Sequence, residues 1–167
     1  MTRMLVFSLA CWLLASQAVG AQQPAAEKTP SPAPSQETLE KQFAETMSGA
    51  TLLGHFTIAD QANGQPLKEE RYTLGTVAKL KNGLWSFETR IQYGDHDVKV
   101  PLALHVHWAG ETPMITLTDV AIPGLGTFTT RVLVYRGQYA GTWSGSDHGG
   151  HLFGKVLKAK TDAPAAE

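Results

Sequence analysis

Two pairs of histidines are the residues of this sequence that could most directly do chemistry. His105 and His107 are separated by one residue, and His148 and His151 flank a Gly-Gly pair next to Asp147. The first spacing places two imidazoles on one face of a strand, a pair spacing that zinc sites use. Three neutral ring nitrogens and a carboxylate could hold Zn²⁺ and leave one position open for water. If the two pairs meet in space, the sequence predicts metal binding or metal-assisted hydrolysis.

The strand register favours a different interpretation of the first pair. His105 and His107 alternate with Leu104 and Val106, so they lie on the outer face of a strand whose aliphatic residues point inward. A histidine in that position is usually solvated. His148 could instead act as a general base, but the sequence names no partner that would orient it. The pattern therefore favours a protein that is not an enzyme, and it indicates no cofactor.

A second set of candidates could line a pocket for a small apolar ligand. Aromatic residues recur at strand spacing, and a Pro-Gly turn displays one aliphatic side chain on each side. The alternative is that the aromatic residues are plain core and that the turn folds over the end of its own core. The candidate ligand-binding residues are Trp85, Tyr93, Trp108, Ile122, Leu125 and Trp143.

The elements that must position these residues are strands, because the apolar period changes to two after residue 50. The clearest alternation runs from Leu84 to Tyr93, directly after a Lys-Asn-Gly turn signal. The expected strands span residues 51–59, 67–80, 84–93, 98–108, 113–120, 127–135, 138–144 and 151–156. In the second of them, the residues expected to share one face are Tyr72, Leu74, Thr76, Ala78 and Leu80.

Short turns between about eight strands force antiparallel neighbours. Each strand has one apolar face, and closure into a barrel covers that face without a partner and removes the sheet edges. Glycines such as Gly141 and Gly154 suit a strongly coiled sheet in which the backbone approaches a bulky neighbour, with Trp143 the expected neighbour. The sequence thus predicts an all-β antiparallel up-and-down barrel over residues 50–158, with a two-sheet sandwich as the alternative.

The chain before the barrel divides into three segments. Residues 1–21 have the build of a secretory signal, with Arg3, an apolar run and small residues at the end. Residues 22–35 are rich in Pro and Ala and predict a disordered tether. Ser35 stands where an N-cap is expected, and residues 36–49 predict a short amphipathic helix that lies on the barrel, plugs one end or binds a partner. Residues 159–167 predict a flexible tail.

The charge and the cysteine content of the sequence limit the classes of partner and the cellular locations that we expect. One of the 14 basic residues falls in the signal, which leaves 13 basic against 15 acidic residues in the exported chain. No basic footprint for nucleic acid is visible. The apolar run is too short for a permanent membrane-spanning helix, and it contains the only cysteine, Cys11. We expect a secreted or periplasmic protein whose partner is a small apolar ligand or an envelope protein.

Four short motifs carry a resemblance. They are Ile91-Gln-Tyr-Gly-Asp95, Ile115-Thr-Leu-Thr-Asp119, Tyr139-Ala-Gly-Thr-Trp143 and Gly149-Gly-His-Leu-Phe-Gly154. With them the chain resembles a family of small secreted bacterial proteins of no established activity, which implies export and a barrel but no site residues. Through Gly141-x-Trp143 it is loosely similar to calycins of the lipocalin and avidin kind. Lipocalins carry G-x-W in the first strand and this chain carries it in the seventh, so the likeness concerns the fold only.

Overall fold

The computed structural model describes residues 33–59 and 66–158 of the 167-residue chain. The predicted signal, almost all of the tether and the tail lie outside these residues. One helix and eight strands follow in chain order. They are α1 (Gln36–Met47), β1 (Thr51–Phe56), β2 (Lys68–Lys79), β3 (Leu84–Tyr93), β4 (His96–Ala109), β5 (Thr112–Ile122), β6 (Gly126–Tyr135), β7 (Gln138–Ser144) and β8 (Gly149–Leu157).

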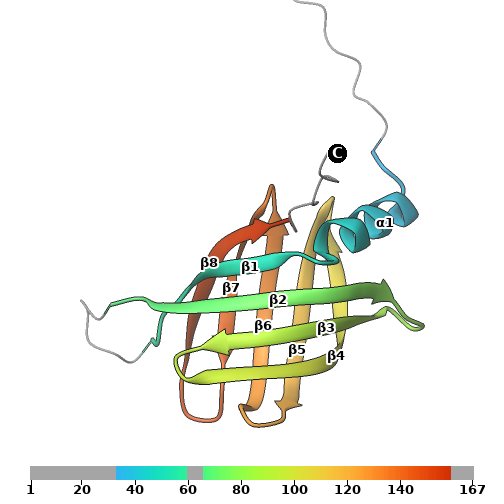
Figure 1. Ribbon diagram of the computed structural model, residues 1–167. Coiled ribbons are helices and arrows are strands. Elements are labelled where there is room, and N and C mark those ends of the chain that lie inside the picture. The colour runs from blue at the N-terminus through green and yellow to red at the C-terminus, as the bar shows by residue number, and fades with distance from the viewer. Residues whose placement is uncertain (1–32, 60–65, 159–167) are drawn as a thin grey trace, which may run out of the picture. The chain divides into compact units, whose positions relative to one another are not determined.

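The strands form a closed antiparallel barrel in which each strand pairs with its neighbours in sequence. The barrel closes where β1 pairs with β8, from Thr51 opposite Leu157 to Phe56 opposite Leu152. In Figure 1, β2, β3 and β4 run across the direction of β5, β6 and β7, so the sheet is strongly coiled. The structure confirms the predicted up-and-down barrel and not the sandwich.

A β-bulge in β2 corrects one detail of the predicted register. The pairing of β2 with β3 shifts between Leu74 and Val77. The bulge places one extra residue in the strand, so the inward face continues at Val77, which is 3% exposed, and Thr76 is exposed. The prediction that Thr76, Ala78 and Leu80 continue the face of Tyr72 and Leu74 is therefore wrong.

A second bulge lies in β5. The pairing with β6 shifts between Leu117 and Val120, and Asp119 adopts a φ of 52°. The Asp119 N–H donates to Oγ1 of Thr129 at 3.0 Å, and this hydroxyl donates to Asp119 Oδ1 at 3.1 Å. The left-handed conformation is thus held by local hydrogen bonds, and the bulge bends β5 where the sheet must curve.

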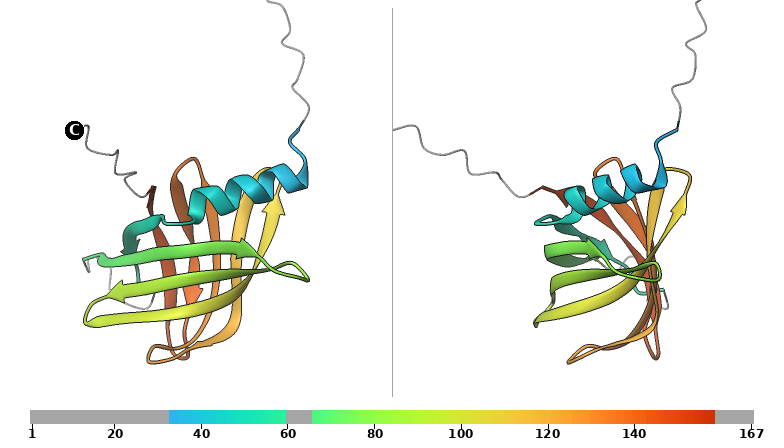
Figure 2. Two further views of the ribbon diagram at one scale, coloured as in Figure 1. Left: turned by 45° about the vertical axis from the view of Figure 1, so that its right-hand side comes forward. Right: turned by 90° about the vertical axis from the view of Figure 1, so that its right-hand side faces the viewer.

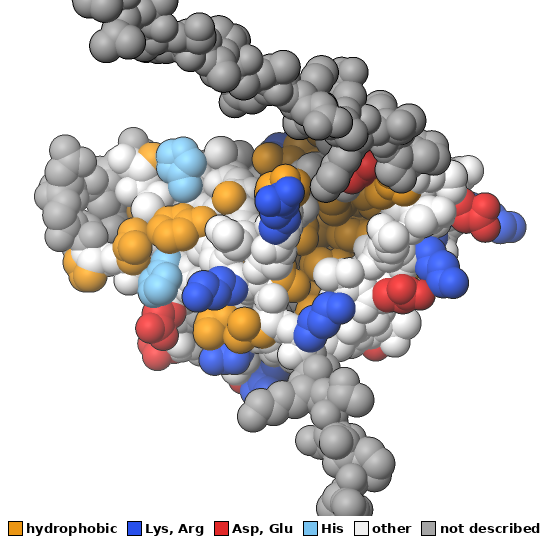
Figure 3. Space-filling model, turned by 90° about the horizontal axis from the view of Figure 1, so that it is seen from above, with side chains coloured by type: hydrophobic (Ala, Val, Ile, Leu, Met, Phe, Trp, Pro, Cys, Tyr) orange, Lys and Arg blue, Asp and Glu red, His pale blue; other side chains and the backbone are white. Residues whose placement is uncertain are grey.

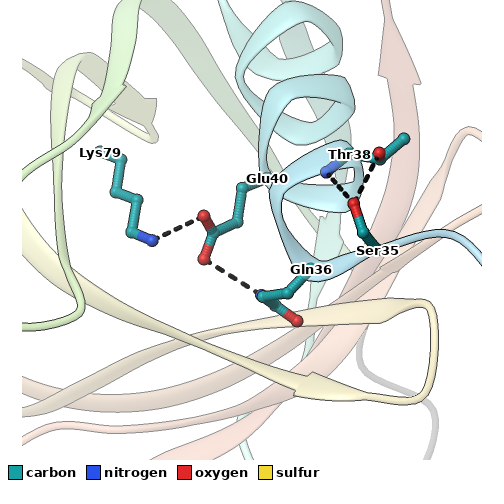
Figure 4. A network of polar contacts seen from close by, with 5 residues as sticks. All are labelled: Ser35, Gln36, Thr38, Glu40 and Lys79. Carbon is teal, nitrogen blue, oxygen red and sulfur yellow. Dashed lines mark hydrogen bonds and ion pairs between the residues drawn. The ribbon is translucent and has the colours of Figure 1, made fainter.

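Helix α1 begins at the predicted cap and is tied to the barrel wall. The Ser35 side chain accepts a hydrogen bond from the Thr38 N–H at 3.2 Å, which satisfies one free donor of the first turn. Glu40 accepts from Lys79 at the end of β2 at 2.6 Å and from Gln36 at 3.1 Å. Figure 4 shows this network joining the helix to β2.

The apolar face of α1 closes one end of the barrel. Leu39, Phe43 and Met47 are 9%, 4% and 0% exposed. The Phe43 ring lies edge-on to the rings of Trp85 and Trp108, with centroids 5.1 and 6.0 Å apart. Figure 2 shows α1 across this end in both views. Within the described residues, no helix combines the length and apolar character needed to cross a membrane.

Candidate functional site

The barrel encloses a cavity of about 960 Å³. It extends from Met47, at the end covered by α1, to the loops at the other end that contain Asp95 and His148. Its apolar wall comes from inward-facing residues of all eight strands, and these include Leu52, Phe56, Leu74, Phe87, Ile91, Leu102, Leu104, Ile115, Leu117, Phe128, Val132, Trp143 and Leu152. An eight-stranded barrel is wide enough to hold one small ligand when side chains do not fill it.

The barrel wall is least continuous between β4 and β5. β4 pairs with β3 from Leu84 opposite His105 to Tyr93 opposite His96, but with β5 only over His105–Ala109. Beyond that ladder the two strands separate towards the open end. A Cβ added to Gly124 would lie 3.8 Å from Cγ1 of Val98, so the β5–β6 turn reaches β4 across this gap.

That turn forms an apolar lip on the cavity. The Leu125 N–H donates to the Ile122 carbonyl at 3.0 Å, and Gly124 has a φ of 80°, as a type II turn with Pro123 requires. Ile122 is buried, Leu125 packs on the core, and both line the cavity. The turn therefore contributes to the core and to the cavity wall at once.

A tyrosine crosses two strands inside the barrel. Tyr139 on β7 pairs with Gly154 on β8, and Gly154 pairs with Gly54 on β1. Gly54 in turn pairs with Glu70 on β2. A Cβ on Gly154 would come within 2.6 Å of Cε1 of Tyr139, and one on Gly54 would collide with the Tyr139 hydroxyl. The two glycines thus leave the space through which the phenol reaches Glu70.

Glu70 is a buried carboxyl group held by two phenols on the cavity wall. Its side chain accepts from the Tyr139 hydroxyl on Oε1 and from the Tyr72 hydroxyl on Oε2, both at 2.8 Å. Glu70 is 3% exposed. Burial raises the pKa of Glu70 more than the two phenolic hydrogen bonds lower it. Burial next to Glu70 also raises the pKa of Tyr72 and of Tyr139, so both phenols stay protonated as donors.

Trp143 crosses β8 in a similar way nearer the open end. It lies opposite Gly150, and a Cβ there would collide with the Thr57 carbonyl. The indole N–H of Trp143 donates to that carbonyl at 3.1 Å. The ring packs edge-on against Phe56, with centroids 5.7 Å apart, and lines the cavity.

One further polar atom lies on this wall. Thr130 lines the cavity from β6, and its hydroxyl oxygen is buried with no hydrogen-bond partner among the described residues. A buried hydroxyl without a partner is uncommon, because its desolvation is not compensated. The cavity therefore offers polar groups at a few positions in a mostly apolar wall.

The structure divides the six predicted ligand-binding residues into two groups. Tyr93, Ile122, Leu125 and Trp143 line the cavity. Trp85 is 1% exposed and, with Trp108, packs against Phe43 of α1. These two tryptophans belong to the core at the closed end and do not line the cavity.

The predicted histidine cluster does not assemble. His105 and His107 stack with ring centroids 5.9 Å apart on the outer face of β4. His151 is on β8, which lies opposite β4 in the barrel order, and His148 is in the β7–β8 loop. His148 Nδ1 lies 2.5 Å from Asp147 Oδ1 on the surface. Among the described residues, no group of three His, Cys, Asp or Glu could hold a metal ion.

The sequence did not predict that Glu70, Tyr72 and Tyr139 form a hydrogen-bonded cluster on the cavity wall. Lys68 to Arg71 reads as a charged start of a strand, which suggests solvent exposure. The signal that could have revealed Glu70 is the period of two, because Glu70 precedes the inward-facing Tyr72 by two residues. Its contact with Tyr139 could not be read from either segment alone.

The face seen in Figure 3 carries Lys, Arg, Asp and Glu side chains interspersed with hydrophobic ones, and charge of one sign does not gather there among the described residues.

Comparisons with protein-family models, with curated proteins and with solved structures found no match to this chain.

Proposed function

We propose that this protein is an exported binding protein that holds a small, mostly apolar ligand inside its barrel. The observation that carries the proposal is the cavity of about 960 Å³, whose lining is mostly apolar and also includes charged residues such as Lys68, Asp95 and Asp147. Small-molecule sites are concave and mostly apolar, and a few polar groups fix the orientation of the ligand. Glu70, Tyr139 and Thr130 are such groups here.

One feature of the open end supports ligand binding over a purely structural role. The loops at the open end include no helix comparable to α1 among the described residues, so ligand entry is expected there. Export rests on the sequence of residues 1–21, and an envelope partner stays a prediction.

The test is fluorescence titration with N-phenylnaphthylamine, a neutral apolar probe that brightens in a dry pocket, followed by displacement with decanol. We expect saturable binding at one site per chain. Leu102→Glu places a charge on the cavity wall and should weaken binding at least tenfold, since a desolvated carboxylate is costly. Ala103→Glu adds the same charge on the exposed face of β4 and should leave binding unchanged.

A second variant tests whether loss of probe binding results from the filled cavity and not from misfolding. Leu102→Trp fills part of the cavity without adding charge and should also reduce probe binding, while circular dichroism confirms the β-sheet content of each variant. Absence of saturable binding by the wild-type protein would overturn the proposal. Equal loss in the Ala103→Glu variant would also contradict it, because the probe would then be bound on the outer surface.

A further inference from the structure

The position of Glu70 indicates which head group the proposed ligand carries. We infer that the ligand carries an amine head group, which binds the Glu70 carboxylate while its apolar body fills the rest of the cavity. This inference rests on the proposed function and specifies the class of ligand. It is carried by the position of one buried carboxyl group, that of Glu70, on the wall of a mostly apolar cavity.

The two tyrosines use only part of the hydrogen-bonding capacity of Glu70. A carboxylate offers about four lone-pair sites, and the described side chains fill one on each oxygen, from Tyr139 and from Tyr72. Both phenols are donors, so they fix the carboxylate without adding positive charge. The remaining sites can accept hydrogen bonds from a group inside the cavity.

No cation of the described residues pairs with Glu70. The ion pairs in this part of the chain join Lys79 with Glu40, Arg90 with Asp97, and His148 with Asp147. The titratable groups that act on the Glu70 carboxyl are Tyr72 from β2, Tyr139 from β7 and His55 from β1, and Tyr93 from β3 acts on Tyr72. The other charged or titratable residues of the cavity lining are Lys68, Glu69, Asp95, His96, Asp147 and His148. His55 favours the charged form of Glu70 only through space, and weakly compared with the cost of burial.

A buried carboxylate is costly unless a positive charge or several donors compensate it. A protonated amine supplies the missing charge and up to three N–H donors. A ligand carboxylate would instead face repulsion from Glu70, and an alcohol would supply only one donor. The site therefore discriminates by head group, whereas the apolar wall binds any tail of suitable size.

The experiment compares three probes with the same tail, which are decylamine, decanol and decanoic acid, each below its micelle concentration. Their affinities are measured by displacement of N-phenylnaphthylamine at neutral pH. We expect decylamine to bind about tenfold tighter than decanol, which corresponds to about 1.4 kcal/mol, and decanoic acid to bind most weakly. The preference for the amine should decline in acid, as Glu70 becomes protonated.

Glu70→Gln is the informative variant, since glutamine keeps the size and an acceptor but removes the charge. It should abolish the preference for decylamine and leave decanol affinity within about twofold. Glu111→Gln removes the same charge from the exposed β4–β5 turn and should keep the preference. Urea unfolding of each variant verifies that the barrel is intact.

The outcomes separate this inference from the proposed function. Binding of none of the three probes would overturn both. Equal binding of decylamine and decanol, tighter binding of decanoic acid, or a preference that survives in Glu70→Gln would overturn the amine inference alone. If decylamine and decanol bind equally, or if the preference survives in Glu70→Gln, Glu70 would serve only to brace Tyr139.

Discussion

The hydroxyl of Tyr139 donates a 2.8 Å hydrogen bond to Glu70 from 69 residues away in the sequence. Tyr139 is on β7 and Glu70 on β2, so the contact passes over β8 and β1, where the barrel closes. It braces the wall at the pairing that joins the first strand to the last. The same contact orients Glu70, the one carboxyl group that is buried among the described residues, on the wall of the cavity.

Gly54→Ala should destabilise the barrel by about 2 kcal/mol, because overpacking a filled interior usually costs 1–3 kcal/mol. The new methyl group would collide with the Phe153 carbonyl on β8 and with the Tyr139 hydroxyl. Urea unfolding followed by circular dichroism measures the change. Gly145→Ala is the control, since its Cβ would meet Phe128 and the His148 carbonyl at an ordinary 3.7 Å. Equal stability of both variants would show that the glycine is not needed for the Tyr139 contact.

Glu70 should make the stability of the protein fall as the pH rises. Burial raises its pKa in the folded state above the ordinary value of 4.5, so the folded protein binds more protons than the unfolded chain between the two pKa values. Its contribution is fully present below pH 4.5 and is lost as the pH rises through the folded-state pKa.

The measurement is the free energy of unfolding of the wild type minus that of Glu70→Gln, across the acid and neutral range. The subtraction removes the opposite effect of Asp97, whose pKa the Arg90 hydrogen bond lowers and whose contribution is therefore lost in acid. We expect the difference to decrease with rising pH and then to level. A difference that increases with pH would mean that Glu70 is stabilised as the carboxylate.

The sequence predicted the barrel because strand alternation is a local property. Every second residue from Trp85 to Tyr93 points inward, as its pattern indicates, and Ser35 caps α1 where an N-cap is expected. The bulge after Leu74 was not predictable, because nothing local marks it except Gly75, and glycine also occurs at many regular positions of this chain.

The candidate site was harder to predict than the fold, since it depends on contacts between distant strands. The same period-two pattern describes Trp85, which packs under α1, and Tyr93, which lines the cavity. Alternation distinguishes the inside from the outside of a barrel but not one end from the other. Trp85 lies at the closed end because Phe43 of α1 packs against it. Nothing in the strand sequences identifies Phe43 as the residue that covers Trp85.

Phe43→Ala should destabilise the protein by about 3–4 kcal/mol, as large-to-small changes of buried aromatic residues do. Phe43 is 4% exposed and packs edge-on against Trp85, Phe87 and Trp108. Chemical denaturation measures the loss, and near-ultraviolet circular dichroism should show the tryptophans becoming less ordered. Gln42→Ala, on the exposed face of α1, should change stability by less than about 0.5 kcal/mol. A small effect of Phe43→Ala would mean that α1 does not close the barrel.

Trp143 should be the residue that reports ligand binding. It lines the cavity, whereas Trp85 and Trp108 pack against Phe43 at the closed end. An apolar ligand that replaces water next to the indole should shift the tryptophan emission of the wild type to shorter wavelength. Trp143→Phe should abolish this shift and, through loss of the hydrogen bond to the Thr57 carbonyl, cost about 1 kcal/mol of stability.

Trp108→Phe is the matched control, because it removes an indole at the closed end and should keep the full ligand-dependent shift. Decanol titration of the three proteins, followed by emission spectra, makes the comparison. A shift that survives in Trp143→Phe but disappears in Trp108→Phe would place the ligand under α1, next to the residues that the aromatic pattern first suggested. Loss of the shift in Trp143→Phe alone would place the ligand beside Trp143, in the cavity that Glu70 also lines.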